Sequence, residues 1–87
     1  MKTFHLTVSS PDGNIFEGEI YKLDVRGIMG ELAIMAGHVP FVTSVKSAPC
    51  KVWLDEDNVK NATTNGGLLT VDKTSVTLIS GSFKFTD

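Results

Sequence analysis

Apolar and polar residues alternate with a period of two along most of the chain. Phe4, Leu6 and Val8 fall on one side of a first extended segment. His5 and Thr7 fall on the other side, as expected for a strand with one buried face. The same period recurs at Tyr21, Leu23 and Val25; Leu32 and Ile34; within 41–46; Val52 and Leu54; within 59–63; Leu69 and Val71; Val76 and Leu78; and Phe83 and Phe85.

Glycine, proline and short polar residues separate these segments. The run from Pro11 to Asn14 predicts a turn, and so does the acidic run from Asp55 to Asn58. Ile15 and Phe16 are expected to form a second, short strand, and Gly18 predicts a bulge or bend that interrupts it. Pro49 is expected to end the strand over 41–46. The residues from Asn65 to Gly67 can adopt positive φ angles at low steric cost, so this run predicts a tight connection.

The composition agrees with strands rather than helices. Nine Val, five Ile and nine Thr contrast with four Ala, and no segment has helical periodicity. Nine or ten short strands with closely spaced turns predict an all-β sandwich or barrel. Eighty-seven residues allow one domain, 1–87, with no linker and no internal repeat.

Charge and apolar content exclude several classes of function. The formal net charge is −2 without a block of like charge, so binding of nucleic acid through a basic patch is not expected. The longest apolar stretch, Leu32 to Gly37, is far shorter than a membrane span, and the amino terminus does not resemble a signal peptide. Cys50 is the only cysteine, as is common in reducing compartments. We therefore expect a soluble, cytoplasmic chain.

Reactive chemistry is sparse. His5, His38 and Cys50 have no second ligand at a metal-binding spacing, and no phosphate-binding glycine loop occurs. The acidic run at 55–57 lacks the glycine and the distal Glu of a calcium loop, so a solvated turn is the better interpretation. We expect neither a metal nor a cofactor, and no catalytic residues.

One segment, from Gly27 to Pro40, departs from ordinary strand sequence. Ile28 and Met29 lie between two glycines, where a hairpin tip is usually polar. Two exposed apolar residues indicate contact with a partner, although the tip can also fold back and bury them. Glu31 can equally be an exposed strand residue, and His38 a loop histidine whose ring is satisfied by backbone groups.

Three blocks of the sequence together resemble the amino-terminal domain of the epsilon subunit of rotary F-type ATP synthases. They occur in the family's order and span nearly the whole chain. The blocks are Val8 to Glu19, with Pro11-Asp12-Gly13; Gly30-Glu31-Leu32 to Gly37-His38-Val39-Pro40; and Gly66-Gly67-Leu68-Leu69-Thr70-Val71.

The resemblance implies a ten-stranded β-sandwich of two sheets and a mechanical role. Epsilon subunits bind the base of the gamma subunit and rest on the c-subunit ring, so that the three turn together as a rotor. By resemblance, the turn with Ile28, Met29 and Glu31 faces the c ring, where Glu31 attracts basic or amide groups. Ser10, His38 and Thr43 lie toward gamma by the same resemblance.

The expected function is therefore that of a non-catalytic central-stalk subunit of a proton- or sodium-translocating ATP synthase, peripheral on the cytoplasmic face of the bacterial inner membrane. Typical epsilon subunits continue into an inhibitory carboxy-terminal pair of helices, which these residues do not include. A shortened chain and a naturally short member both explain this, and the lack of a tag favours the second. The alternative function is a small-molecule-binding sandwich or barrel unrelated to ATP synthase, with Trp53 and Tyr21 lining its pocket.

Overall fold

The computed structural model describes residues 1–87 and contains strands, turns and bends but no helix. The strands are β1 (Phe4–Ser10), β2 (Gly13–Ile20), β3 (Lys22–Gly27), β4 (Gly30–Met35), β5 (Phe41–Val45), β6 (Ala48–Trp53), β7 (Val59–Thr64), β8 (Gly67–Val71), β9 (Ser75–Ser80) and β10 (Phe83–Phe85). The all-β class and the ten strands expected from the sequence are confirmed.

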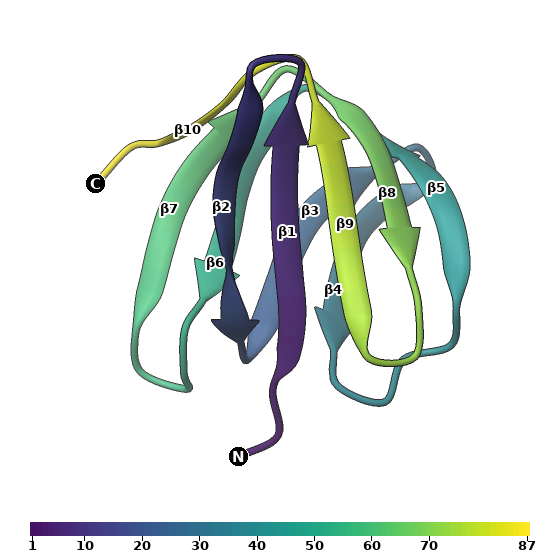
Figure 1. The fold of residues 1–87 in the computed structure, drawn as a ribbon, viewed down its shortest axis with the longest axis vertical. Coiled ribbons are helices and arrows are strands. Elements are labelled where there is room, and N and C mark those ends of the chain that lie inside the picture. Colours follow the sequence, from purple (N-terminus) through teal and green to yellow (C-terminus); the bar gives the residue numbers. More distant parts are fainter.

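The strands form a sandwich whose two layers are joined at one corner. Pairing runs β10-β7-β6-β3-β5-β8-β9-β1-β2, with β4 on the free side of β3. Strands β3 and β5 pair only through Gly27 and Val45, so the sheet bends there and folds back over itself. In Figure 1 the layer with β1, β2, β8 and β9 lies in front of β3 and β4.

The opposite ends of this folded sheet meet through aromatic side chains. Phe16 of β2 and Phe85 of β10 pack with their ring centroids 5.8 Å apart. Phe83 packs on Phe85 in turn, in an edge-to-face arrangement at 5.4 Å. Such pairs stabilise a core beyond the area that they bury, so the sandwich is closed at this side by packing rather than by hydrogen bonds.

The core follows from the alternation along each strand. As predicted, Phe4, Leu6 and Val8 point inward from β1 while His5 and Thr7 are only half-buried. One apolar cluster joins both layers and consists of Phe4, Leu6, Val8, Ile20, Leu23, Val25, Ile34, Val45, Cys50, Val52, Ala62, Leu69, Val71, Val76, Leu78 and Phe83. Because burial of apolar area is the main favourable term in folding, this cluster holds the layers together.

Two details of strand β2 differ from the sequence prediction. Gly18 does not interrupt the strand, because it pairs in register with Leu6 of β1. The irregularity lies at Ile15 instead, since Val8 pairs with Phe16 but Ser9 pairs with Asn14. Gly18 adjoins the Phe16 ring, which is 3.6 Å from where its Cβ would lie. The predicted turn is also shorter, because β2 already begins at Gly13.

The prediction that Pro49 ends a strand was wrong. Pro49 is the second residue of β6, opposite Thr63 of β7. Strand β6 pairs with β3 only through its last residues, from Lys51 onward. Pro49 therefore has a neighbouring strand on one side only. At such an edge position the missing N–H of proline removes no hydrogen bond from a ladder.

The tight connection predicted at Asn65–Gly67 is confirmed, and it carries the chain from one layer to the other. Gly66 has a φ of +104°, which favours glycine. A Cβ on Gly67 would lie 2.0 Å from the carbonyl oxygen of Ile79, so only glycine fits at that position. The side chain of Ser80 is buried beside this connection and donates to the Gly66 carbonyl at 2.7 Å.

Candidate interaction surfaces

The tip of the β3–β4 hairpin is apolar and exposed. Gly27 pairs with Gly30, which leaves Ile28 and Met29 as the two turn residues. Ile28 is 55% exposed and Met29 94% exposed, so neither side chain folds back into the core. Gly30 has a φ of +124°, a backbone conformation that glycine adopts without strain. The tip therefore presents two apolar side chains to solvent on a rigid hairpin.

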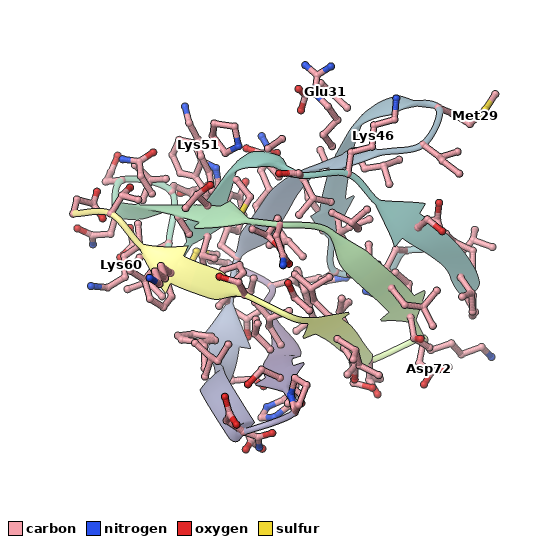
Figure 2. The ribbon with its side chains drawn as sticks, turned by 90° about the horizontal axis from the view of Figure 1, so that it is seen from above. Met29, Glu31, Lys46, Lys51, Lys60 and Asp72 are labelled. Atoms are coloured by element: carbon pink, nitrogen blue, oxygen red, sulfur yellow. The ribbon has the colours of Figure 1, made fainter.

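The base of this hairpin is charged and tied to β5. Arg26 Nη2 donates to Glu31 Oε1 at 3.0 Å, across the two strands of the hairpin. The Lys46 backbone N–H donates to the Arg26 carbonyl at 2.8 Å, and the Ile28 N–H donates to the Ser44 carbonyl at 3.2 Å. Figure 2 shows Glu31, Lys46 and Met29 along one side of the molecule, at the top of that view.

The outer face of strands β1, β9, β8 and β5 carries no charged side chain over eight neighbouring positions. The pairing registers place these positions in two rows across the strands, Thr7–Thr77–Thr70–Val42 and Ser9–Ile79–Leu68–Ser44. Val42, Leu68 and Ile79 are 61%, 43% and 52% exposed. We call these eight residues the uncharged face. Exposed aliphatic side chains without neighbouring charges make this face a candidate interaction surface.

The outer face of the other layer is different in character. Its outward positions carry both basic and acidic side chains, Lys22, Asp24, Arg26, Glu31, Lys51 and Lys84, interspersed with less polar residues such as Ala33, Met35 and Trp53. Such a mixed surface is well solvated and is typical of a face that meets water. The two sides of the sandwich are therefore unequal, and the uncharged face is the side suited to contact another protein.

A histidine between two carboxylates borders the uncharged face. His5 Nε2 lies 3.0 Å from Glu17 Oε2, and His5 Nδ1 lies 3.2 Å from Glu19 Oε2. A carboxylate only accepts hydrogen bonds, so both contacts are satisfied when the imidazole is doubly protonated. The hydrogen bond to Glu17 raises the pKa of His5 above its ordinary value, and the bond to Glu19 contributes in the same direction.

The groups with reactive potential elsewhere are few. Cys50 is buried, and its desolvation raises the pKa of the thiol to about 11, so the thiol is protonated at neutral pH. No cluster of three or more His, Cys, Asp or Glu side chains is arranged to hold a metal ion. The structure contains no helix that is long and apolar enough to traverse a membrane.

Trp53 and Tyr21, the residues of the alternative ligand pocket, line a depression together with Lys22, Met35 and Glu56. The indole of Trp53 is already engaged within the domain. Its Nε1 donates to Asp24 at 2.8 Å, and the Lys22 ammonium lies 5.5 Å from the ring centroid. Both its polar group and its π face are therefore occupied by neighbouring side chains.

The three residues expected near gamma lie on different elements. Ser10 ends β1 and accepts a hydrogen bond from the Asp12 N–H at 3.2 Å within the turn. Thr43 is half-buried in the middle of β5. His38 lies in the loop before β5 and packs edge-to-face on Phe4 at 5.4 Å, with both ring nitrogens buried and unpaired. The ring nitrogens of His38 thus face inward, whereas the hydroxyl of Ser10 is engaged within an exposed turn.

The family model for the beta-sandwich domain of the ATP synthase delta/epsilon chain matches residues 3–85. The chain belongs to this family. The fold is also that of a chain in the Euglena gracilis mitochondrial ATP synthase (OSCP/F1/c-ring, rotational state 1), with a TM-score of 0.88 at 19% identity over 95% of this chain. A chain in the Tetrahymena thermophila mitochondrial ATP synthase central stalk/c-ring gives 0.77 at 12% over 94%.

This delta/epsilon domain spans 53% of the Euglena chain and 66% of the Tetrahymena chain. At these identities the likeness concerns the fold. Membership of the family sets aside the alternative of a sandwich unrelated to ATP synthase.

Sequence reasoning missed the exposed aliphatic residues of the delta/epsilon domain's uncharged face. Their signal is a pair of adjacent apolar residues inside a strand, which breaks strict alternation. Such pairs occur at Phe41-Val42, Leu68-Leu69 and Leu78-Ile79. In each pair one member points into the sandwich and the other lies outside.

Proposed function

We propose that this domain is a central-stalk subunit of a rotary F-type ATP synthase that links the gamma subunit to the c-subunit ring. In this role it turns with both partners and helps to transmit the torque that proton or sodium flow generates at the ring. It has no catalytic residue and needs no cofactor. Its family supports this proposal, and so do the central-stalk and c-ring complexes in which similar folds occur.

The observation that supports the proposal is the presence of two exposed surfaces of different character on one closed sandwich. The exposed apolar hairpin tip is the proposed ring contact, formed by Ile28, Met29 and Glu31. The uncharged face is the proposed gamma contact. A connector needs both surfaces at once, together with an interior that deforms little under load.

The residues assigned to gamma lie close to the uncharged face along the chain. Thr43 lies between Val42 and Ser44 but pairs with the buried Leu69, so its side chain is on the other side of β5 from theirs. Ser10 directly follows Ser9 at the end of β1. His38 lies in the loop that leads into β5. Besides Ser10, His38 and Thr43, the proposed gamma contact includes the exposed aliphatic residues Val42, Leu68 and Ile79 of the uncharged face.

The proposed location follows from these partners. The domain is peripheral and reaches the membrane only through the complex, on the cytoplasmic face of the bacterial inner membrane. Nucleic acid is not a partner in this proposal, since the basic side chains are interspersed with acidic ones.

The test is attachment of the chain to its cognate gamma subunit and c ring. The domain is expected to co-elute with gamma in size-exclusion chromatography at micromolar concentration. The double variant Ile28→Asp with Met29→Asp is expected to lose the ring while it retains gamma and an unchanged circular dichroism spectrum. If native mass spectrometry detects no complex of the unaltered domain with gamma, the proposal is rejected.

A further inference from the structure

The charges beside the hairpin tip have an excess of hydrogen-bond donors. Arg26 uses one of its five N–H donors on Glu31, through the Nη2 to Oε1 bond at 3.0 Å. Lys46 adds an ammonium with three donors, and it takes part in none of the ion pairs of the domain. Glu31 therefore offsets one of two neighbouring positive charges, and one remains without a partner.

These groups project together rather than apart. The Lys46 N–H is bonded to the Arg26 carbonyl at 2.8 Å, which fixes the two residues side by side at the corner between the layers. Figure 2 shows Glu31 and Lys46 on the side from which Met29 also projects. A partner that covers the apolar tip will therefore also cover this charged ledge, which we define as Arg26, Glu31 and Lys46.

Covering the ledge removes water from its cationic groups. Removing water from an ammonium group is strongly unfavourable unless the group gains a hydrogen-bond acceptor. Neither a neutral apolar surface nor a basic one compensates for the lost solvation. Carboxylates compensate best, since they accept charge-assisted hydrogen bonds from both Arg and Lys. The partner surface opposite the ledge must therefore supply acidic groups.

We propose that the hairpin docks on an acidic site at the surface of the c ring, where a partner carboxylate is bound by Lys46 and by the free N–H groups of Arg26. Glu31 acts as a positioning residue, which holds the Arg26 side chain toward the partner. This inference rests on the proposed ring contact and reverses the chemistry expected from Glu31 alone, which favours basic or amide groups.

Charge variants of the full chain distinguish the two chemistries. Binding of the gamma-bound domain to the cognate c ring in zwitterionic-lipid nanodiscs is measured by biolayer interferometry at low and high NaCl. Lys46→Glu is expected to weaken binding about tenfold at low salt, as for close interfacial charge pairs, and Lys46→Gln less. The difference shrinks at high salt because exposed charges are screened.

Two further variants act as controls. Lys84→Glu makes the same charge change on β10, three strands away from β3 in the same layer, and is expected to change ring binding less than about twofold. Glu31→Gln removes the internal partner of Arg26. Binding is expected to be unchanged or tighter, whereas a direct bond from Glu31 to a basic ring group requires weaker binding.

The possible results separate the inference from the function on which it rests. Equal binding by Lys46→Glu and Lys84→Glu, or a larger loss for Glu31→Gln than for Lys46→Glu, overturns the inference while ring attachment stands. An effect of Lys46→Glu on ring-free anionic nanodiscs equal to that on the ring also overturns it, since the acidic groups then belong to lipid. Failure of the unaltered domain to bind either partner overturns both proposals.

Discussion

Leu68 and Leu69 provide a matched test of the uncharged face, because they are adjacent residues of one type on opposite sides of β8. Leu69 is fully buried in the apolar cluster, whereas Leu68 is 43% exposed beside Ile79. The same substitution to alanine at each position is expected to have two different consequences.

The magnitudes follow from these exposures. Leu69→Ala leaves a cavity in the core and is expected to reduce the free energy of unfolding by about 2–5 kcal/mol. Complete burial of a leucine side chain stabilises by about 1.5–3 kcal/mol. A partner that covers the exposed 43% of Leu68 therefore gains roughly 0.6–1.3 kcal/mol, so Leu68→Ala is expected to weaken gamma binding about threefold to ninefold.

Urea unfolding measures the first effect, and isothermal titration calorimetry with gamma measures the second. Gamma affinity of Leu69→Ala is compared only under conditions where that variant remains folded, as judged by circular dichroism. The interpretation fails if Leu68→Ala destabilises the isolated domain as much as Leu69→Ala does, or if it binds gamma with unaltered affinity.

Three other predictions concern stability and reactivity. His5 has a folded-state pKa raised chiefly by its hydrogen bond to Glu17, so its stabilisation is present below the unfolded-state pKa of about 6.5 and is lost as the pH rises through the folded-state pKa. The difference in urea midpoint between the unaltered chain and His5→Gln should therefore shrink from pH 6 to pH 9, and a difference that grows would contradict the cluster. Gly67→Ala is expected to cost more than about 2 kcal/mol, because its Cβ would strike the Ile79 carbonyl, whereas Gly18→Ala costs less than about 1 kcal/mol; equal thermal midpoints would refute this. The thiol of Cys50, with a pKa of about 11, is expected to react with a maleimide far more slowly in the folded domain than in urea at pH 7, and comparable rates would show that it is accessible.

Local patterns predicted most of the architecture. The alternation at Phe4, Leu6 and Val8 identifies a strand and its buried side because side chains in an extended chain point alternately to its two faces. Residue type alone did not place the irregularities. Gly18 and Pro49 are each compatible with a regular strand when the neighbouring strand is suitably placed, and that neighbour is set by pairing far along the chain.

The candidate surfaces divide in the same way. The hairpin tip was found from its sequence because Ile28 and Met29 are adjacent and enclosed by glycines. The uncharged face was not, because it depends on a parallel pairing that brings Ser9 beside Ile79, and on the further register with Leu68. A surface assembled from four strands has no contiguous sequence signature.

The main-chain bonds between the hairpin and β5 determine how a load passes through the domain. A push on Met29 reaches Ser44 through the Ile28 N–H and reaches Lys46 through the Arg26 carbonyl. Ser44 belongs to the uncharged face, together with Val42 of the same strand, so the force arrives at the proposed gamma contact along peptide groups and never has to cross side-chain packing. Mechanical compliance between the two proposed partners is therefore set by a few hydrogen bonds at one bend of the sheet. Weakening these bonds would reduce the coupling while the fold stays intact.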